Sequence, residues 1–265
     1  MTYFCSSDIH SFFDEWMLSL KTKKFDIKNP SHVIIICGDL FDRGRQSTEC
    51  FNFVKELSKQ NRLIYIRGNH EDLLCSVVDD LNKNKSIGNH HISNGTIQTL
   101  ADILDCSSYD VLYRTYDLNK WRNVVEEDLV SFVNNTTVDY FELSDKVFVH
   151  GWVPTTCDEN RQMIVHDNWR DGDWKEARWE NGIEMWHFKV QPLDKCVVCG
   201  HWHCSYGWSH YDRKYKEFPQ KTHEDFEYSF NPYIKDGLIA IDACTAYSGK
   251  VNVVVFDDHG CLIEF

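Results

Sequence analysis

The sequence predicts an α/β protein, a four-layer α-β-β-α sandwich in which two mixed sheets stack and helices cover their outer faces. Residues 1–70 alternate apolar runs with amphipathic segments, an order that favours right-handed crossovers and parallel strands. Asp, His and Asn side chains directly follow several apolar runs, where open α/β sheets keep their functional groups. Residues 238–265 add apolar runs separated by glycine-containing turns, which indicates a second, more antiparallel sheet.

The N-terminal elements follow from hydrophobic periodicity. Their expected order is strand, helix, strand, helix, strand, at residues 3–5, 12–20, 33–37, 47–59 and 63–67. Ser11 is a candidate N-cap for the first helix, because its hydroxyl can accept a hydrogen bond from a free backbone N–H. The second helix places Phe51, Val54 and Leu57 on one face, as a helix that packs on a sheet requires.

The middle and C-terminal parts are predicted more coarsely. Helices are expected at residues 72–81 and 119–133, with a polar loop at 82–94. A hairpin turns at Ser144-Asp145, and its second strand leads into His150. Its strands and the later ones are expected at 141–143, 147–149, 196–199, 238–242, 251–256 and 261–265. We expect a single domain over 1–265, with a tryptophan-rich insertion around 152–190 and a loop insertion around 205–236.

Composition limits the classes of partner. The net charge of -13 argues against nonspecific binding to nucleic acid or to an anionic membrane surface. No basic region precedes an apolar stretch at the N-terminus, and the longest aliphatic run, Val33–Cys37, is too short to span a membrane. Eleven cysteines in a long chain without such a signal favour reduced thiols. We therefore expect a cytoplasmic protein.

Five short segments carry side chains that bind metals. They are Asp8-Ile9-His10, Gly38 to Gly44, Gly68-Asn69-His70-Glu71, His150-Gly151 and Gly200-His201-Trp202-His203. Their carboxylate, amide and imidazole donors suit two divalent ions, with manganese expected and iron, zinc or magnesium as alternatives. Five such segments in one chain predict phosphate-ester hydrolysis at a two-metal site.

The spacing of these residues divides the ligands between the two ions. Two ions about 3.5–4 Å apart need a bridging ligand, and Asp39 is placed for that role. The other ligands form two sets, Asp8 and His10 for one ion and Asn69, His150 and His201 for the other. Water that bridges the ions would lose its proton readily and attack phosphorus as hydroxide.

Three further residues suit the rest of the reaction. His70 adjoins Asn69 and can protonate the leaving oxygen. Asp42 can orient that imidazole and favour its charged form. Arg43 can hold the phosphate through two parallel hydrogen bonds, which Lys would do poorly, and Gly44 would let the turn bring Arg43 inward.

These segments resemble the calcineurin-like metallophosphoesterases, most closely the phosphoprotein phosphatases in their bacterial and phage forms. That family carries GDxHG, GDxxDRG, GNHE, a later HG and a final single-His motif; Gly38–Gly44 and Gly68–Glu71 match completely. The segment Ile241–Lys250 is similar to the family's IDTG…GG segment. The resemblance implies the four-layer fold, two metal ions and the roles given above for Asp8, His10, Asp39, Asp42, Arg43, Asn69, His70, His150 and His201, with Asn69 also near the bound phosphate.

Two motifs depart from that pattern. Ser7-Asp8-Ile9-His10-Ser11 lacks both family glycines, so its turn is expected to differ. The last motif ends in a second histidine, His203, which is more typical of the wider metallophosphoesterases, where that residue binds the first metal. We expect His203 either to be this additional ligand or to stack or hydrogen-bond at the rim of the site.

Three other features have alternative interpretations. The family supplies a second phosphate-binding arginine from this region, for which Arg170 and Arg178 are the candidates. Seven of the nine tryptophans lie between Trp152 and Trp208, which favours a packed aromatic cluster over a wall that holds a base or peptide above the metals. The spacing of Cys196-x-x-Cys199 is similar to that of zinc ligands. One such pair without a second is a weak signal, and the same residues also form the predicted strand that precedes His201.

The leading hypothesis is a metal-dependent phosphatase that hydrolyses phosphate monoesters, as serine/threonine protein phosphatases do. The alternative keeps the site but changes the substrate to a dinucleoside polyphosphate or a nucleotide phosphodiester. A third hypothesis, a non-catalytic metal-binding regulator, is disfavoured because the segments retain every ligand and the acid histidine. The expected partner is therefore a phosphorylated substrate, a phosphoprotein or a nucleotide-like molecule.

Overall fold

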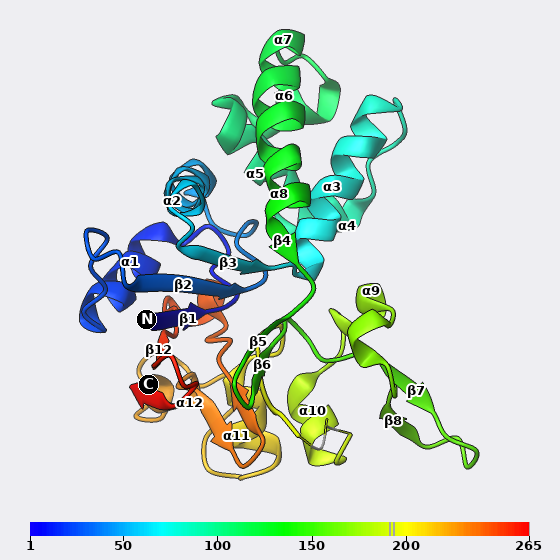
Figure 1. Cartoon of the computed structure of the whole chain (residues 1–265). Helices are drawn as coiled ribbons and strands as arrows, with labels where there is room; N and C mark the ends of the chain where they lie inside the picture. The colour runs from blue at the N-terminus through cyan, green and yellow to red at the C-terminus, as the bar shows by residue number, and fades with distance from the viewer. Residues whose placement is uncertain (191, 193, 265) are drawn as a thin grey trace.

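A computed structural model describes residues 1–190, 192 and 194–264, and its first sheet is built around the N-terminal strands. Strands β1 (Thr2–Ser6), β2 (His32–Cys37), β3 (Leu63–Ile66) and β4 (Thr137–Val138) run parallel, each beside the next. Strands β12 (Val254–Phe256) and β13 (Leu262–Glu264) extend the other edge antiparallel, in the order β13-β12-β1-β2-β3-β4. Figure 1 shows both termini near this edge.

The second sheet has five strands in the order β10-β11-β9-β6-β5. Its bounds are β5 (Phe141–Leu143), β6 (Lys146–Phe148), β9 (Cys196–Cys199), β10 (Tyr233–Lys235) and β11 (Leu238–Ala240). The three inner strands are parallel and the two outer pairs antiparallel, so this sheet is also mixed. Strands β7 (Thr155–Cys157) and β8 (Met163–Val165) form a separate hairpin that projects from the body of the molecule (Figure 1).

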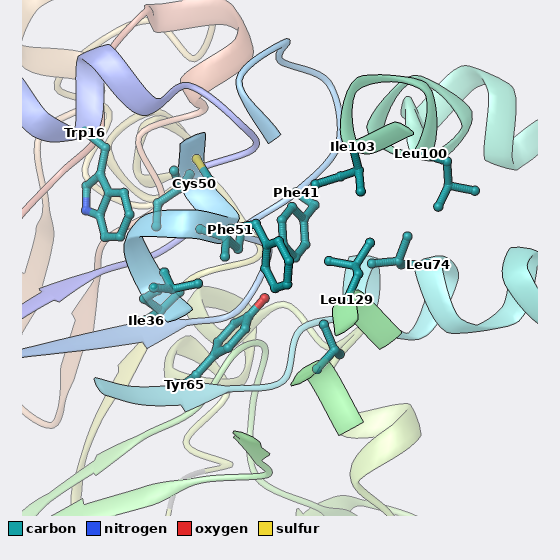
Figure 2. Packing of buried hydrophobic residues seen from close by; sticks show 14 of the residues in the cluster. Trp16, Ile36, Phe41, Cys50, Phe51, Tyr65, Leu74, Leu100, Ile103 and Leu129 are labelled. Carbon is teal, nitrogen blue, oxygen red and sulfur yellow. The ribbon is translucent and has the colours of Figure 1, made fainter. Parts of the chain in front are cut away.

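Alternating side chains of β2 explain the layers. Ile34 and Ile36 face one way and join a core with helices α1 (Phe13–Thr22), α2 (Ser47–Lys59), α3 (Asn69–Asn82) and α5 (Thr96–Leu104). Figure 2 shows Ile36, Tyr65 and Phe51 in this core. Ile35 and Cys37 face the other way and pack between the two sheets against Phe148 and Val198. The predicted α-β-β-α order is therefore confirmed on this side of the molecule.

The fourth layer covers the far face of the second sheet. Val147, Val197 and Leu238 pack there against Trp152 and Tyr233. The covering segments are η2 (Trp169–Asp171), α9 (Trp174–Ala177), α10 (Gly182–His187) and α11 (Cys204–His210). Helix α12 (Phe226–Ser229) contacts α11. Trp152, Trp169 and Trp174 are buried in this layer, as a packed aromatic cluster requires, whereas Trp179 and Trp202 are exposed.

The C-terminal strands differ from the sequence expectation. We expected them in the second sheet, but β12 and β13 pair with the first, where Phe4 lies opposite Val255. The physical reason is that β12 is apolar on both faces: Val255 packs against the helices, and Val254 and Phe256 pack between the sheets. Phe265, expected to end the last strand, lies outside the described residues.

Helix boundaries differ from the sequence prediction in three places. The Ser11 hydroxyl does not cap α1; it hydrogen-bonds the Ser47 hydroxyl at 2.9 Å, and Phe12 occupies the N-cap position. The predicted polar loop at 82–94 ends in α4 (Asn89–Asn94). The expected helix at 119–133 is part of a longer helical run, α7 (Leu118–Lys120), η1 (Trp121–Val130) and α8 (Ser131–Thr136). Two further short helices are α6 (Ser108–Tyr113) and α13 (Thr245–Ser248).

None of the described helices combines the length and the apolar character that crossing a membrane requires.

Candidate metal centre

The turns that follow β1 and β2 are held together by backbone hydrogen bonds. Asp8 N–H donates to the carbonyl of Gly38 at 3.2 Å, and His10 N–H donates to the carbonyl of Asp39 at 3.0 Å. The two turns therefore form one rigid unit, with the predicted ligands of both strands on the same edge of the sheet.

Several residues of these turns, and His201 in the loop after β9, adopt left-handed backbone conformations. Asp8, His10, Asp39 and His201 have φ values of 51°, 52°, 57° and 65°. Such values are uncommon for residues other than glycine, and they cluster at functional sites because the strain must be held by surrounding structure. Ser11, which stands where the related pattern has glycine, has a φ of 59°, so this turn forms without glycine.

Two positions require glycine because atoms of a neighbouring segment lie where a Cβ atom would stand. A Cβ atom on Gly44 would lie 2.4 Å from the carbonyl oxygen of His10. Arg43 itself takes the left-handed conformation, with a φ of 61°, so Gly44 allows the turn to pack and does not bend the chain there. A Cβ atom on Gly200 would lie 2.3 Å from Oδ2 of Asp8, which is how the loop after β9 comes so near the first turn.

Asp39 lies at the centre of the site. Its Oδ1 is 3.3 Å from Nε2 of His150, and its Oδ2 is 3.9 Å from Nε2 of His10 and 3.8 Å from Nε2 of His70. Burial opposes ionisation of this carboxyl, but the surrounding imidazoles, His150 first among them, hold the pKa of Asp39 well below its ordinary value. Asp39 is therefore a carboxylate that faces two clusters of nitrogen donors.

The two clusters share Asp39 as their common member. In one, ligand atoms of His10, Asp39 and His70 lie within 4.8 Å of one another; in the other, those of Asp39, His150 and His201 do. This donor chemistry fits two divalent ions with a bridging carboxylate. Neither of these two clusters, among the described residues, contains a cysteine of the Cys196-x-x-Cys199 segment.

Asp8 and Asn69 complete the predicted set. Oδ1 of Asp8 lies 3.9 Å from Nε2 of His10, beside the first cluster. Oδ1 of Asn69 is 2.8 Å from Nε2 of His150, in the second. Six predicted ligands thus converge from turns that follow strands of both sheets: Asp8, His10, Asp39, Asn69, His150 and His201.

The titratable groups of the site differ in the direction of their pKa shifts. Burial raises the pKa of Asp8 to about 6, and the nearby Asp39 carboxylate adds to this rise. Burial lowers the pKa of His150, but Asp39 outweighs it and raises the pKa to about 10. Burial and the neighbouring His150 lower the pKa of His201 to about 3, so its imidazole is neutral at physiological pH, as a metal ligand must be.

Glu71 is a buried residue of the candidate site to which the sequence prediction gave no role. Its buried carboxylate accepts four hydrogen bonds, from the N–H groups of Asp39 (2.9 Å), Gly68 (2.8 Å) and Leu40 (3.0 Å) and from the hydroxyl of Tyr65 (2.7 Å). It therefore ties the turn that carries Asp39 to the turn that carries Asn69 and His70. The signal was present in the GNHE motif, but its partners are mainly backbone groups that no sequence pattern shows.

The predicted catalytic residues form a chain beside Asp39. Nδ1 of His70 is 2.7 Å from Oδ2 of Asp42, and its Nε2 is 3.4 Å from Nη2 of Arg43. Burial lowers the pKa of His70, but Asp39 and the bond to Asp42 outweigh it and raise the pKa above its ordinary value. Asp42 is itself fixed by the hydroxyls of Thr96 and Thr99, each donating at 2.8 Å, which sequence reasoning also missed.

His203 lies apart from the two clusters. Its Nδ1 is 2.8 Å from the Ser205 hydroxyl, and its Nε2 is 3.6 Å from a carboxylate oxygen of Glu217. The Phe218 ring lies 4.9 Å from the His203 ring. These contacts match the rim position that was one of its two expected placements, and its role as a metal ligand stays a prediction.

The two candidate arginines have different surroundings. Arg170 pairs with Glu142 at 2.6 Å and lies over the Trp169 ring. Arg178 is buried, pairs with Asp72 at 2.9 Å and also pairs with Asp139. The Arg178 backbone packs against Gly151, directly after His150, so of the two arginines Arg178 has the clearer contact with a ligand turn. Phosphate binding by either residue stays a prediction.

Comparisons with known proteins agree with this geometry. A family model described as "Calcineurin-like phosphoesterase" matches residues 1–230. A bis(5'-nucleosyl)-tetraphosphatase PrpE (asymmetrical) from Anoxybacillus flavithermus is 39% identical over 80 residues, 28% of this chain and 33% of that protein. Its Bacillus subtilis counterpart is 37% identical over 76 residues, 26% of this chain and 31% of that protein. The aligned region thus spans about a third of the length of these relatives.

Solved structures also resemble this chain over its whole length. The crystal structure of a putative diadenosine tetraphosphatase superposes with a TM-score of 0.53 at 16% identity and covers 100% of this chain and 92% of that one. At this identity, the likeness shows a shared fold.

Proposed function

Because the chain belongs to the calcineurin-like phosphoesterase family, a family of metal-dependent hydrolases, we propose that it hydrolyses phosphate monoesters. The observation that carries this proposal is the His70 imidazole, held by Asp42 on one nitrogen and adjacent to Arg43 on the other, beside Asp39. A monoester needs a proton for its leaving oxygen and a cation for its terminal phosphoryl oxygens, and this arrangement offers both.

We propose Asp8, His10 and Asp39 as ligands of one ion. Asp39, Asn69, His150 and His201 would hold the other. When bound, two such ions lower the pKa of water and take up charge on the phosphoryl oxygens. Manganese is the ion we expect, with iron, zinc and magnesium as alternatives.

The protein's own groups have separable tasks in this proposal. Arg43 presents a planar guanidinium to the phosphoryl oxygens. His70 donates a proton from Nε2 to the leaving oxygen, while Asp42 accepts the hydrogen bond from Nδ1–H and keeps the ring in place. Glu71 keeps the Asp39 turn and the His70 helix at a fixed separation, because it accepts hydrogen bonds from the backbone of both turns.

A dinucleoside polyphosphate is the second candidate substrate. Two relatives that align with about a quarter of this chain are named as tetraphosphatases. Two exposed rings also lie beside His201: Trp179 at 5.9 Å and Trp202 at 6.1 Å between ring centroids. Stacking of a base on such rings would position a nucleotide next to the second cluster.

The test compares rates on four substrates with added manganese: a phosphoserine peptide, a nucleoside monophosphate, diadenosine tetraphosphate and a phosphodiester. We expect the phosphopeptide and other monoesters to react fastest, and a strong chelator to abolish every rate until manganese is restored. If diadenosine tetraphosphate reacts much faster than any monoester, the second candidate replaces the first. Undiminished turnover in metal-free protein would refute both.

A further inference from the structure

A pocket of about 440 Å³ lies outside the metal centre, between the C-terminal part of α1 and the segments around α11 and α12. Its principal side chains are Lys23 from the end of α1, Trp208, Lys214 and Tyr215 from α11 and the loop after it, Tyr228 from α12, and Lys250. None of the described residues that line the pocket belongs to either metal-binding cluster. Its volume lies within the range of small-molecule sites, about 300–1,000 Å³.

The charge of this pocket is opposite to that of the protein. The chain has 41 acidic and 28 basic residues, yet three lysines and no Asp or Glu are found among the described residues that line the pocket. The Lys250 ammonium donates to the backbone carbonyl of Glu227 at 3.0 Å, which leaves its positive charge uncompensated by that contact. Such a local excess of cations favours an anionic ligand.

The pocket also has an aromatic wall. The rings of Tyr215 and Tyr228 are nearly parallel, with an interplanar angle of 22° and 6.1 Å between centroids. Trp208 meets Tyr215 edge-on at 5.7 Å. The Lys214 ammonium lies 5.3 Å from the centroid of Trp208 and 5.1 Å from that of Tyr215, so a cation and π faces occupy the same small volume. Such a wall suits a flat ring that carries a negative group.

We propose that this pocket binds a nucleoside phosphate. The base would stack on Tyr228 and Tyr215, since every base has a π face and aromatic side chains bind it without sequence preference. The phosphate would lie among Lys214, Lys250 and Lys23, while the side chains of Ser19 and Asn231 offer hydrogen-bonding groups for the sugar or base. This site is separate from the catalytic one and needs no metal.

The experiment measures AMP binding by calorimetry to the chain of 265 residues in excess chelator, so that the metal centre holds no ions. We expect one saturable site, with adenosine and inorganic phosphate each binding at least ~10-fold more weakly than AMP, because each lacks one of the two features. The affinity should fall with added salt, as a lysine-bound phosphate requires. A short oligoadenylate that binds much more tightly than AMP would overturn the mononucleotide site in favour of a nucleic-acid site.

Two variants locate the site. Tyr228→Ala should weaken AMP binding by ~5- to 150-fold through loss of stacking, and Lys250→Gln by roughly two- to fivefold. Tyr228 is 52% exposed, so its removal should leave the fold and the rate on nitrophenyl phosphate unchanged. The matched controls are Tyr113→Ala, at a 64% exposed tyrosine, and Lys85→Gln, both outside the pocket. Absence of saturable binding, or equal losses in the pocket and control variants, would overturn the proposal.

Discussion

Replacing Glu71 with glutamine tests whether one buried carboxylate fixes the geometry of the metal centre. In Glu71→Gln, the amide oxygen can keep the bonds from the N–H groups of Asp39 and Gly68. The amide nitrogen then faces the Tyr65 hydroxyl, which can rotate and accept a hydrogen bond, and the N–H of Leu40, which cannot. One buried N–H is therefore left without its acceptor.

The magnitude follows from these contacts. An unsatisfied buried donor costs about 1–3 kcal/mol, and the two bonds that lose their charged acceptor weaken by about 1 kcal/mol each. Part of this cost is offset. Burial and the nearby Asp39 raise the pKa of Glu71, which means that its negative charge is disfavoured at this position, and glutamine carries no such charge. We expect the free energy of unfolding to fall by about 2–4 kcal/mol. Glu71→Ala would remove all four acceptor contacts, a loss comparable to the whole stability of a domain.

The assay is urea denaturation of metal-free protein, followed by titration with manganese. Glu56→Gln is the matched control, because Glu56 is an exposed helical residue bonded only to Gln60 and Lys59 in the described contacts, and its change should stay within about 0.5 kcal/mol. We expect Glu71→Gln also to weaken manganese binding, since the N–H of Leu40, directly after Asp39, loses its acceptor and the bond from the Asp39 N–H weakens. If stability and manganese affinity both equal those of the wild type, the idea that Glu71 ties the two turns together is wrong.

Three further predictions concern the catalytic residues and the charge of the site. His70→Asn should retain both metals in a metal analysis and lose about 10²–10⁴-fold in rate on an alkyl phosphate. The loss should be far smaller on nitrophenyl phosphate, because its leaving group needs no proton. Equal losses on both substrates would argue against the acid role. Arg43→Lys should be nearly as slow as Arg43→Ala and less inhibited by free phosphate, and full activity in the lysine variant would show that only charge matters there. In metal-free protein the pKa of His150 is raised from 6.5 to about 10, mainly by Asp39 acting against burial. The stability that His150 contributes is therefore complete below about pH 6.5 and lost as pH rises towards about 10. The urea midpoint should fall over that range and His150→Gln should flatten the change, whereas identical slopes would contradict it.

The sequence was a good guide where chemistry and strand ends coincide. Asp39 follows an unbroken apolar strand and sits in a motif whose residue types suit a metal, so its central position could be predicted. The same holds for His150 and His201, each of which comes at or just after the end of a strand of the second sheet. In these cases local pattern and tertiary position agree, because parallel strands bring their carboxyl ends to one edge.

Long-range contacts explain what the sequence could not show. Thr96 and Thr99 lie 54 and 57 residues from Asp42, in a helix whose packing no local pattern reveals. Strand β12 pairs with β1 across nearly the whole chain, and an apolar strand carries no mark of which sheet it joins. His203 follows the predicted ligand pattern in type and spacing, yet the direction of its ring depends on Ser205 and Glu217.

The position of the predicted ligands between the two sheets has a mechanical consequence. Asp8, Asp39 and Asn69 come from turns of the first sheet, whereas His150 and His201 come from turns of the second. An ion held by both groups would act as a cross-link that fastens the halves of the sandwich at one rim. Further in, apolar side chains such as Ile35 and Phe148 pack between the sheets. Because binding to the native state alone adds RT ln(1 + [L]/Kd) to stability, metal supply and resistance to unfolding become linked quantities. Melting temperature therefore reports metal occupancy directly, and a cell short of metal would hold a protein that is both inactive and more easily degraded.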